Sequence, residues 1–163
     1  MIQRIQSVYL FVSAAAVAIM FFLPMYIAQL NGAELQVGIT GAELKSEDSI
    51  IESVSHIYVP IIAGITMLLS IVTIFLFNNR PLQTKLARLG TLLYTGLLVA
   101  LLFLAVDGAR AMPNAVALAE NNEVMGNYQV GAFLPIVGMV LSFLAGRAIM
   151  KDEAKVRSAS RLR

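Results

Sequence analysis

The chain has 163 residues, of which 58% are hydrophobic and 13% are charged, and its mean hydropathy is +0.78. A soluble globular domain is about 45–50% apolar and about 25% charged. The composition therefore excludes an ordinary water-soluble domain and favours a chain that places much of its apolar surface in lipid. The absence of cysteine also excludes disulfides, thiol redox chemistry and cysteine-ligated metals.

Four long apolar runs follow one another along the chain. Each approaches the roughly 20 residues that a helix needs to cross a bilayer. They cover residues 8–28, 57–77, 89–106 and 131–150. The sequence therefore predicts an all-α membrane protein: a single domain formed by an up-down bundle of four transmembrane helices, with short outer loops and a basic tail at residues 151–163 that continues the last helix.

The first run follows Arg4 and so resembles a signal peptide. It is longer than a typical signal-peptide core, and it ends in Leu-Pro-Met-Tyr rather than in small residues that suit cleavage. We therefore expect it to be an uncleaved first span.

The segment between the first two runs contains signals for both strand and helix. The stretch ELQVGIT at residues 34–40 alternates weakly after the turn residues Asn31 and Gly32, which predicts at most one short strand, marginal without a partner. Ser46 is followed by two acidic residues, a pattern typical of a helix N-terminus. We expect the second helix to begin there, well outside the bilayer. The other outer segment contains a second helix signal, the Ala-rich stretch at residues 113–123.

Basic and acidic residues are concentrated in different segments between the apolar runs. The N-terminus, the central hairpin and the C-terminal tail are rich in Lys and Arg, whereas residues 30–56 and 107–129 carry more acids than bases. Lys and Arg are retained on the cytoplasmic side of short loops, which predicts that both termini lie in the cytoplasm. The predicted cytoplasmic basic surface consists of Arg80, Lys85, Arg88, Lys151, Lys155, Arg157, Arg161 and Arg163.

The basic tail also allows specific binding. It can contact anionic lipid headgroups or a ribosome, but it has no aromatic residue on which a base could stack, which disfavours nucleic acid as a partner. The simplest interpretation is that its charge follows from a cytoplasmic location.

The fourth run carries a stripe of small residues. Gly138, Ser142 and Gly146 are spaced four residues apart, which places them on one helix face. Helices in lipid associate through such faces. This face is expected to pack within the chain, and the alternative is that it docks another membrane protein or a second copy.

Three prolines lie at a similar depth near the outer ends of the runs. A proline inside a helix removes a hydrogen bond and bends the axis, so the three together could open an outward-facing cleft. The residues of this possible cleft are Pro24, Pro60 and Pro135.

Catalytic and cofactor signatures are absent from the sequence. The apolar runs hold no titratable group in their interior, and the single histidine, His56, is expected at the membrane interface. Asp107 and Arg110 are spaced to form only a weak helix-end pair. Phosphate loops, nucleophile elbows and zinc motifs are missing. We therefore expect no enzyme activity, no cofactor and no metal.

Three stretches carry a family resemblance: MIQRIQS at the start, FNNRPLQTKLARL in the central hairpin, and YQVGAFLP with LAGRAIMKDEAKVRSASRLR near the end. They resemble an uncharacterised family of small four-span inner-membrane proteins of Gram-negative bacteria, known only as a domain of unknown function. The resemblance implies an inner-membrane location and four spans, and it assigns no catalytic residue.

These observations predict a non-catalytic accessory or scaffold subunit of a bacterial inner-membrane assembly. Its partners would be the lipid bilayer and another membrane protein, or a second copy of the chain. The alternative is a transporter or binder of a lipid or another hydrophobic molecule, which would use the outward-facing cleft.

Overall fold

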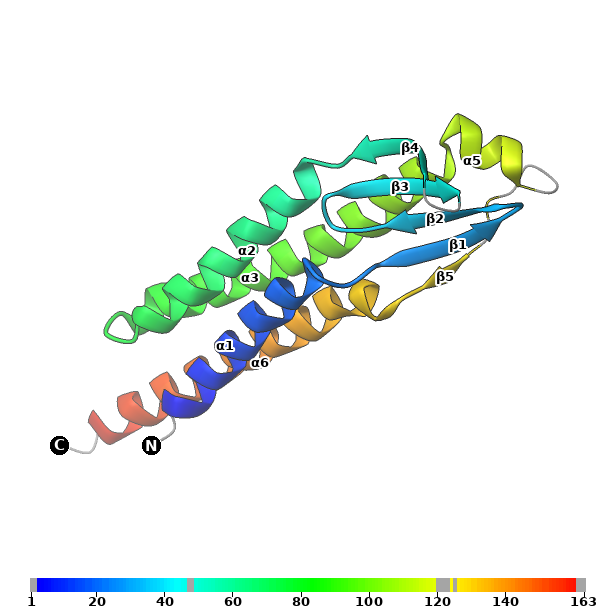
Figure 1. Ribbon diagram of the computed structural model, residues 1–163. Helices are drawn as coiled ribbons and strands as arrows, with labels where there is room; N and C mark the ends of the chain where they lie inside the picture. The colour runs from blue at the N-terminus through cyan, green and yellow to red at the C-terminus, as the bar shows by residue number, and fades with distance from the viewer. Residues whose placement is uncertain (1–2, 47–48, 120–123, 125, 161–163) are drawn as a thin grey trace.

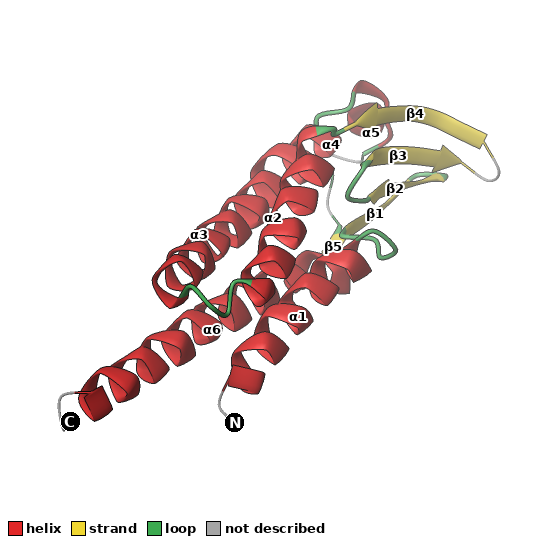
Figure 2. Cartoon of the chain, turned by 90° about the vertical axis from the view of Figure 1, so that its left-hand side faces the viewer, coloured by secondary structure: helices red, strands yellow, loops and turns green. Residues whose placement is uncertain are grey.

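The molecule is a bundle of long helices with a β-sheet at one end (Figures 1 and 2). The structure is a computed structural model, and it describes residues 3–46, 49–119, 124 and 126–160. The start of the first helix, the end of the last and the connection between the second and third lie at the end opposite the sheet (Figure 2). The bundle consists of α1 (Gln3–Met20), α2 (Tyr58–Phe75), α3 (Arg80–Val99) and α6 (Val130–Ser160).

The third helix continues beyond α3 toward the sheet. A π-helical stretch, η1 (Ala100–Val106), leads directly into α4 (Asp107–Arg110), and α5 (Pro113–Leu118) follows. The prediction of a short helix at residues 113–123 is confirmed for Pro113–Leu118, and residues 120–123 lie outside the described part of the chain. At the other end of the sequence, α6 continues without a break from the fourth apolar run into the tail.

The sheet is antiparallel throughout, with the strand order β4-β3-β2-β1-β5. Its strands are β1 (Tyr26–Leu30), β2 (Ala33–Val37), β3 (Gly41–Ser46), β4 (Ser49–Ser55) and β5 (Asn127–Tyr128). The prediction of an all-α four-helix bundle is therefore wrong. The segment expected to hold at most one lone strand supplies three of these five, and β1 and β5 lie on either side of it in the sequence.

The sheet forms because its strands alternate between apolar and polar residues. Residues that lie directly opposite each other on paired strands share a face. One face is buried and packs with residues of η1, α4 and α5 in one hydrophobic cluster; from the sheet it contains Tyr26, Ala28, Leu35, Val37, Ala42 and Leu44. The other face is mostly polar and includes Gln29, Glu34, Gln36, Glu43 and Lys45. Burial of a common inner face stabilises strands that would be marginal alone.

Two local features explain the remaining differences from the expected helices. The first expected span, residues 8–28, is not one helix: α1 ends at Met20, and the chain reaches β1 after a turn that contains Pro24. The Ser46 hydroxyl caps no helix but donates a hydrogen bond of 2.6 Å to the Gly32 carbonyl, across from the first hairpin turn. The chain therefore continues as β4, and α2 begins only at Tyr58.

Helix α2 has its small and polar residues inside and most of its large apolar residues outside. In α2 the buried residues include Ala63, Thr66 and Ser70, whereas Leu68 and Phe75 are 61% and 71% exposed. Such a distribution suits helices that pack closely in lipid. Within the described residues, three helices are long and apolar enough to cross a membrane, namely Tyr58–Phe75, Arg80–Arg110 and Val130–Ala154, and the apolar helix Ile5–Met20 is shorter.

Candidate functional site

The three residues of the predicted small-residue stripe in α6 face α3. A Cβ atom on Gly138 would lie only 2.6 Å from Cδ1 of the fully buried Tyr94 ring. The Ser142 hydroxyl donates to the Ala87 carbonyl at 3.0 Å, and a Cβ atom on Gly146 would lie 3.6 Å from the Ala87 Cβ. The structure thus brings Gly138, Ser142 and Gly146 together in a contact within the chain, which leaves this face covered.

The three prolines occupy different structural settings. Pro24 precedes β1, Pro60 lies in the first turn of α2, and Pro135 lies inside α6. A Cβ atom on Gly131 would lie 2.5 Å from the Pro24 carbonyl oxygen, so α6 packs closely against the chain that leads into the sheet. None of the three lines either of the two cavities described in the next paragraphs.

Of the predicted basic residues whose side chains the structure describes, Arg80, Lys85, Arg88 and Lys151 lie at the end of the bundle away from the sheet. Arg80 begins α3, and the Arg88 guanidinium contacts the Met150 sulfur at 3.0 Å. Lys85 and Lys151 are exposed. The side chains of Lys155 and Arg157, and the residues Arg161 and Arg163, lie outside what the structure describes.

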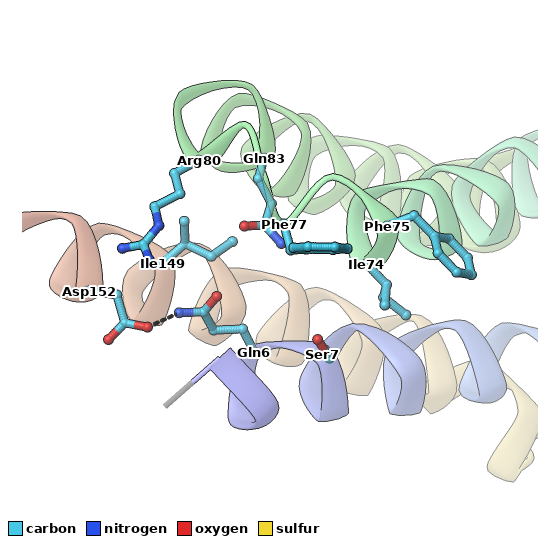
Figure 3. Close-up of a pocket in the computed structure, with 9 residues that line it drawn as sticks. All are labelled: Gln6, Ser7, Ile74, Phe75, Phe77, Arg80, Gln83, Ile149 and Asp152. Atoms are coloured by element: carbon cyan, nitrogen blue, oxygen red, sulfur yellow. Dashed lines mark hydrogen bonds between the residues drawn. The ribbon is translucent and has the colours of Figure 1, made fainter. Parts of the chain in front are cut away.

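A cavity of about 330 Å³ opens at this basic end, between α1, α2, α3 and α6 (Figure 3). This volume is at the low end of the roughly 300–1,000 Å³ found for small-molecule sites. A much smaller cavity of about 50 Å³ lies between α3 and α6. The larger cavity is lined by the apolar residues Ile74, Phe75, Phe77 and Ile149 and the polar residues Gln6, Ser7, Arg80, Gln83 and Asp152.

Hydrogen bonds hold the polar groups of the larger cavity in place. The Gln6 amide donates to Oδ2 of Asp152 at 2.5 Å, which ties α1 to α6 (Figure 3). The Gln83 amide donates to the Thr73 carbonyl at 3.1 Å, which ties α3 to the end of α2. Both glutamines are 4% exposed. The lining of this cavity therefore contains one cation, Arg80, and one anion, Asp152, beside two buried glutamines whose amides are held by hydrogen bonds.

The outer end offers a different kind of surface. Strand β4 forms one edge of the sheet, and nearly all of its residues are exposed. Ile50, Ile51 and Val54 are 59%, 42% and 39% exposed. Glu52, the only charged residue of the strand, accepts a hydrogen bond from the Asn114 backbone N–H at 3.2 Å. The opposite edge is formed by β5, which has only two residues.

His56 connects the sheet to the bundle. His56 is 4% exposed, and its Nε2 atom has no hydrogen-bond partner in the described part of the molecule. The Tyr58 hydroxyl lies 3.3 Å from Nδ1. Burial lowers the pKa of His56 below its ordinary value of 6.5, so the neutral ring is favoured at neutral pH.

Arg110 also links the two parts of the molecule. Its Nε donates to the Tyr26 hydroxyl at 3.2 Å, and its guanidinium carbon lies 4.7 Å from the centre of the Tyr26 ring. The expected pair with Asp107 is present at 3.8 Å, and both side chains are partly exposed. The sequence spacing predicted this pair but gave no sign of the contact with Tyr26, because that contact depends on the sheet.

A comparison with curated proteins finds no match. Comparison with known families matches residues 2–162, nearly the whole chain, to a family described as a domain of unknown function, DUF4293. The family resemblance inferred from the three sequence stretches is thereby confirmed at the level of an uncharacterised family. The chain belongs to the DUF4293 family.

Proposed function

We propose that this chain is a non-catalytic protein of the bacterial inner membrane that serves as an accessory or scaffold subunit, and that its outer sheet binds an extended segment of another membrane protein along β4. The bundle would cross the membrane with the basic end, including both termini, in the cytoplasm. The observation that carries the proposal is the exposed apolar edge strand β4.

The membrane part of the proposal is supported by side-chain distribution and charge. Large apolar side chains are exposed around the bundle, among them Phe11 at 66%, Leu92 at 68% and Phe143 at 52%. Monomeric soluble proteins rarely expose so much contiguous apolar surface. Arg80 and Lys85 at the start of α3 and Lys151 in the last part of α6 lie at the end opposite the sheet, which supports a cytoplasmic location for that end.

The docking part is supported by the contrast between the two sheet edges. Natural proteins protect edge strands by keeping them short or by adding Lys, Pro or a bulge. Here β5 is short, whereas β4 has seven residues with neither Lys nor Pro. A bulge at Ile51 interrupts the pairing with β3, but the pairs from Glu52 to Ser55 are regular. An added strand would find unpaired backbone groups together with apolar side chains on both faces of β4.

Native copurification tests the proposal. A tagged full-length copy, extracted in mild detergent from its own membrane, is expected to bring down a stoichiometric partner. Ile50→Lys combined with Val54→Lys should lose that partner, because both positions are exposed on the edge strand and charge disfavours strand addition. Gln29→Lys is the matched control, because Gln29 is exposed on β1, away from the β4 edge.

The outcomes separate clearly. Loss of the partner from the β4 variant but not from the control supports the proposal. Isolation of the native protein without any stoichiometric partner, or retention of the partner by the β4 variant, contradicts it. Neither of the two cavities described above is lined by Pro24, Pro60 or Pro135.

A further inference from the structure

We infer that the cavity at the basic end binds the headgroup of a zwitterionic phospholipid, with the phosphate on Arg80 and a primary ammonium group on Asp152. Phosphatidylethanolamine has this chemistry. The inference requires that the helices cross a bilayer, and it does not depend on a partner at β4.

The charges of the cavity lining point to a zwitterion. Arg80 supplies a planar cation whose N–H groups suit a phosphate, and it stands at the first turn of α3, where the helix dipole also favours negative charge. Asp152 supplies a carboxylate on the opposite side, from α6 (Figure 3). The two side chains do not form an ion pair with each other, so each charge can bind a group of opposite sign on one ligand.

A hydrogen bond from Gln6 fixes the orientation of the Asp152 carboxylate. Oδ2 of Asp152 already accepts the hydrogen bond from Gln6, which orients the carboxylate and leaves Oδ1 for an ammonium group. An ammonium group donates hydrogen bonds to a carboxylate, whereas a choline headgroup has no N–H donor. An anionic headgroup such as phosphatidylglycerol can place its phosphate on Arg80 but has no ammonium group to compensate the charge of Asp152. The lining therefore favours ethanolamine over choline and over an anionic headgroup.

The apolar part of the lining suits the rest of the lipid. Phe75 and Phe77 line the cavity and are 71% and 53% exposed, so they continue from the cavity onto the outer surface of the bundle. Leu68 and Ile71 precede Phe75 by seven and four residues and are also exposed, which places all three on one side of α2. An acyl chain could follow this side while the headgroup stays in the cavity.

Native mass spectrometry of the full-length protein tests the inference. The probes are phosphatidylethanolamine, phosphatidylcholine and phosphatidylglycerol with identical acyl chains. We expect phosphatidylethanolamine to bind about tenfold more tightly than the other two, since each charged contact is worth roughly a factor of ten. Arg80→Gln should weaken its binding about tenfold. Asp152→Asn should weaken it similarly and also raise the affinity for phosphatidylglycerol, which reverses the preference.

Matched controls use charges at the same end of the molecule that do not line the cavity. Lys85→Gln is the control for Arg80→Gln, and Glu153→Gln is the control for Asp152→Asn. Both controls should leave the order of lipid affinities unchanged. If Arg80→Gln fails to fold, Arg80→Lys keeps the charge and should weaken binding to a smaller extent, because it loses the planar two-pronged contact.

Three results would overturn the inference. The first is equal binding of the three lipids by the unaltered protein. The second is an unchanged lipid preference in folded Asp152→Asn. The third is displacement of the bound lipid by an equal concentration of soluble glycerophosphoethanolamine, which would assign the cavity to a free zwitterion rather than to a membrane lipid.

Discussion

Gly138 is expected to tolerate an added methyl group poorly. In Gly138→Ala the new Cβ atom would lie 2.6 Å from Cδ1 and 2.8 Å from Cζ of Tyr94, whereas ordinary contact begins at 3.4 Å. The ring must therefore move by about 0.8 Å or more at Cδ1. Tyr94 is fully buried, and its hydroxyl lies 3.3 Å from the Ser70 hydroxyl, so little free space is available for this movement.

We expect Gly138→Ala to lower the free energy of unfolding by about 1–3 kcal/mol, the usual cost of overpacking a core. Gly96→Ala in α3 is the matched control, because no atom lies within 4 Å of its added Cβ. The control should be neutral or stabilise the protein by up to about 1 kcal/mol, since alanine favours helix more than glycine does. Reversible unfolding in mixed micelles, followed by circular dichroism, measures both values.

A double-mutant cycle makes the reasoning specific to the contact. In a Tyr94→Val background the ring is gone, so Gly138→Ala should cost less than about 0.5 kcal/mol, the level at which independent sites add. An equal cost in both backgrounds would refute the explanation. So would a Gly138→Ala variant as stable as the Gly96→Ala variant.

Three further predictions concern the outer end. Gly32 has a φ of +75°, so Gly32→Ala should destabilise the protein by about 1–2 kcal/mol in thermal unfolding, whereas Gly38→Ala, which has no such angle, should change it far less. The pKa of His56 is lowered, so the folded protein favours the neutral ring. The stability that the neutral ring contributes is complete above about pH 6.5 and declines as the pH falls below that value. His56→Gln should remove this part of the pH dependence of unfolding. Arg110→Met should cost about 1–2 kcal/mol through the lost contacts with Tyr26, and a change below 0.3 kcal/mol, about the error of such comparisons, would count against that linkage.

The long helices were predictable because their signal is local. Apolar runs of transmembrane length predicted α2, α3 and α6. Among the described residues, α2, α3 with its continuation to Arg110, and α6 are the helices long and apolar enough to cross a membrane. The spacing of Gly138, Ser142 and Gly146 predicted a shared packing face, and all three contact α3. The identity of the contacting residues, Tyr94 and Ala87, could not be read from spacing, because it depends on the rotation of both helices.

The sheet was missed because its stability depends on pairing between distant segments. The Asn31-Gly32 turn was recognised, but the first three residues of the strand before it, Tyr26 to Ala28, were assigned to the first span because they continue an apolar run. Strand β1 pairs with β2 on one side and with β5 on the other, and β5 comes from residues 127–128, almost a hundred positions later in the sequence. Near Ser46, helix-start signals were overridden by the burial of Ala42 and Leu44 in the sheet.

The cavity at the basic end could not be predicted from the sequence for a similar reason. Its polar residues come from α1, α3 and α6, and each of them has an ordinary role on its own helix. Arg80 was assigned only to the basic surface, and Asp152 only to the C-terminal tail at residues 151–163. Their common position becomes clear only when the helix ends are placed in space.

Site-directed labelling tests the central claim, that the bundle crosses the membrane with the sheet outside and the basic end inside. The chain has no native cysteine, so Asn31→Cys in the β1–β2 turn, away from β4, and Asn78→Cys in the α2–α3 connection provide single exposed reporters. In intact cells with a permeabilised outer membrane, a membrane-impermeant maleimide should label position 31 and should label position 78 only after the inner membrane is disrupted. Labelling of position 78 in intact cells, or protection of position 31, would contradict the account.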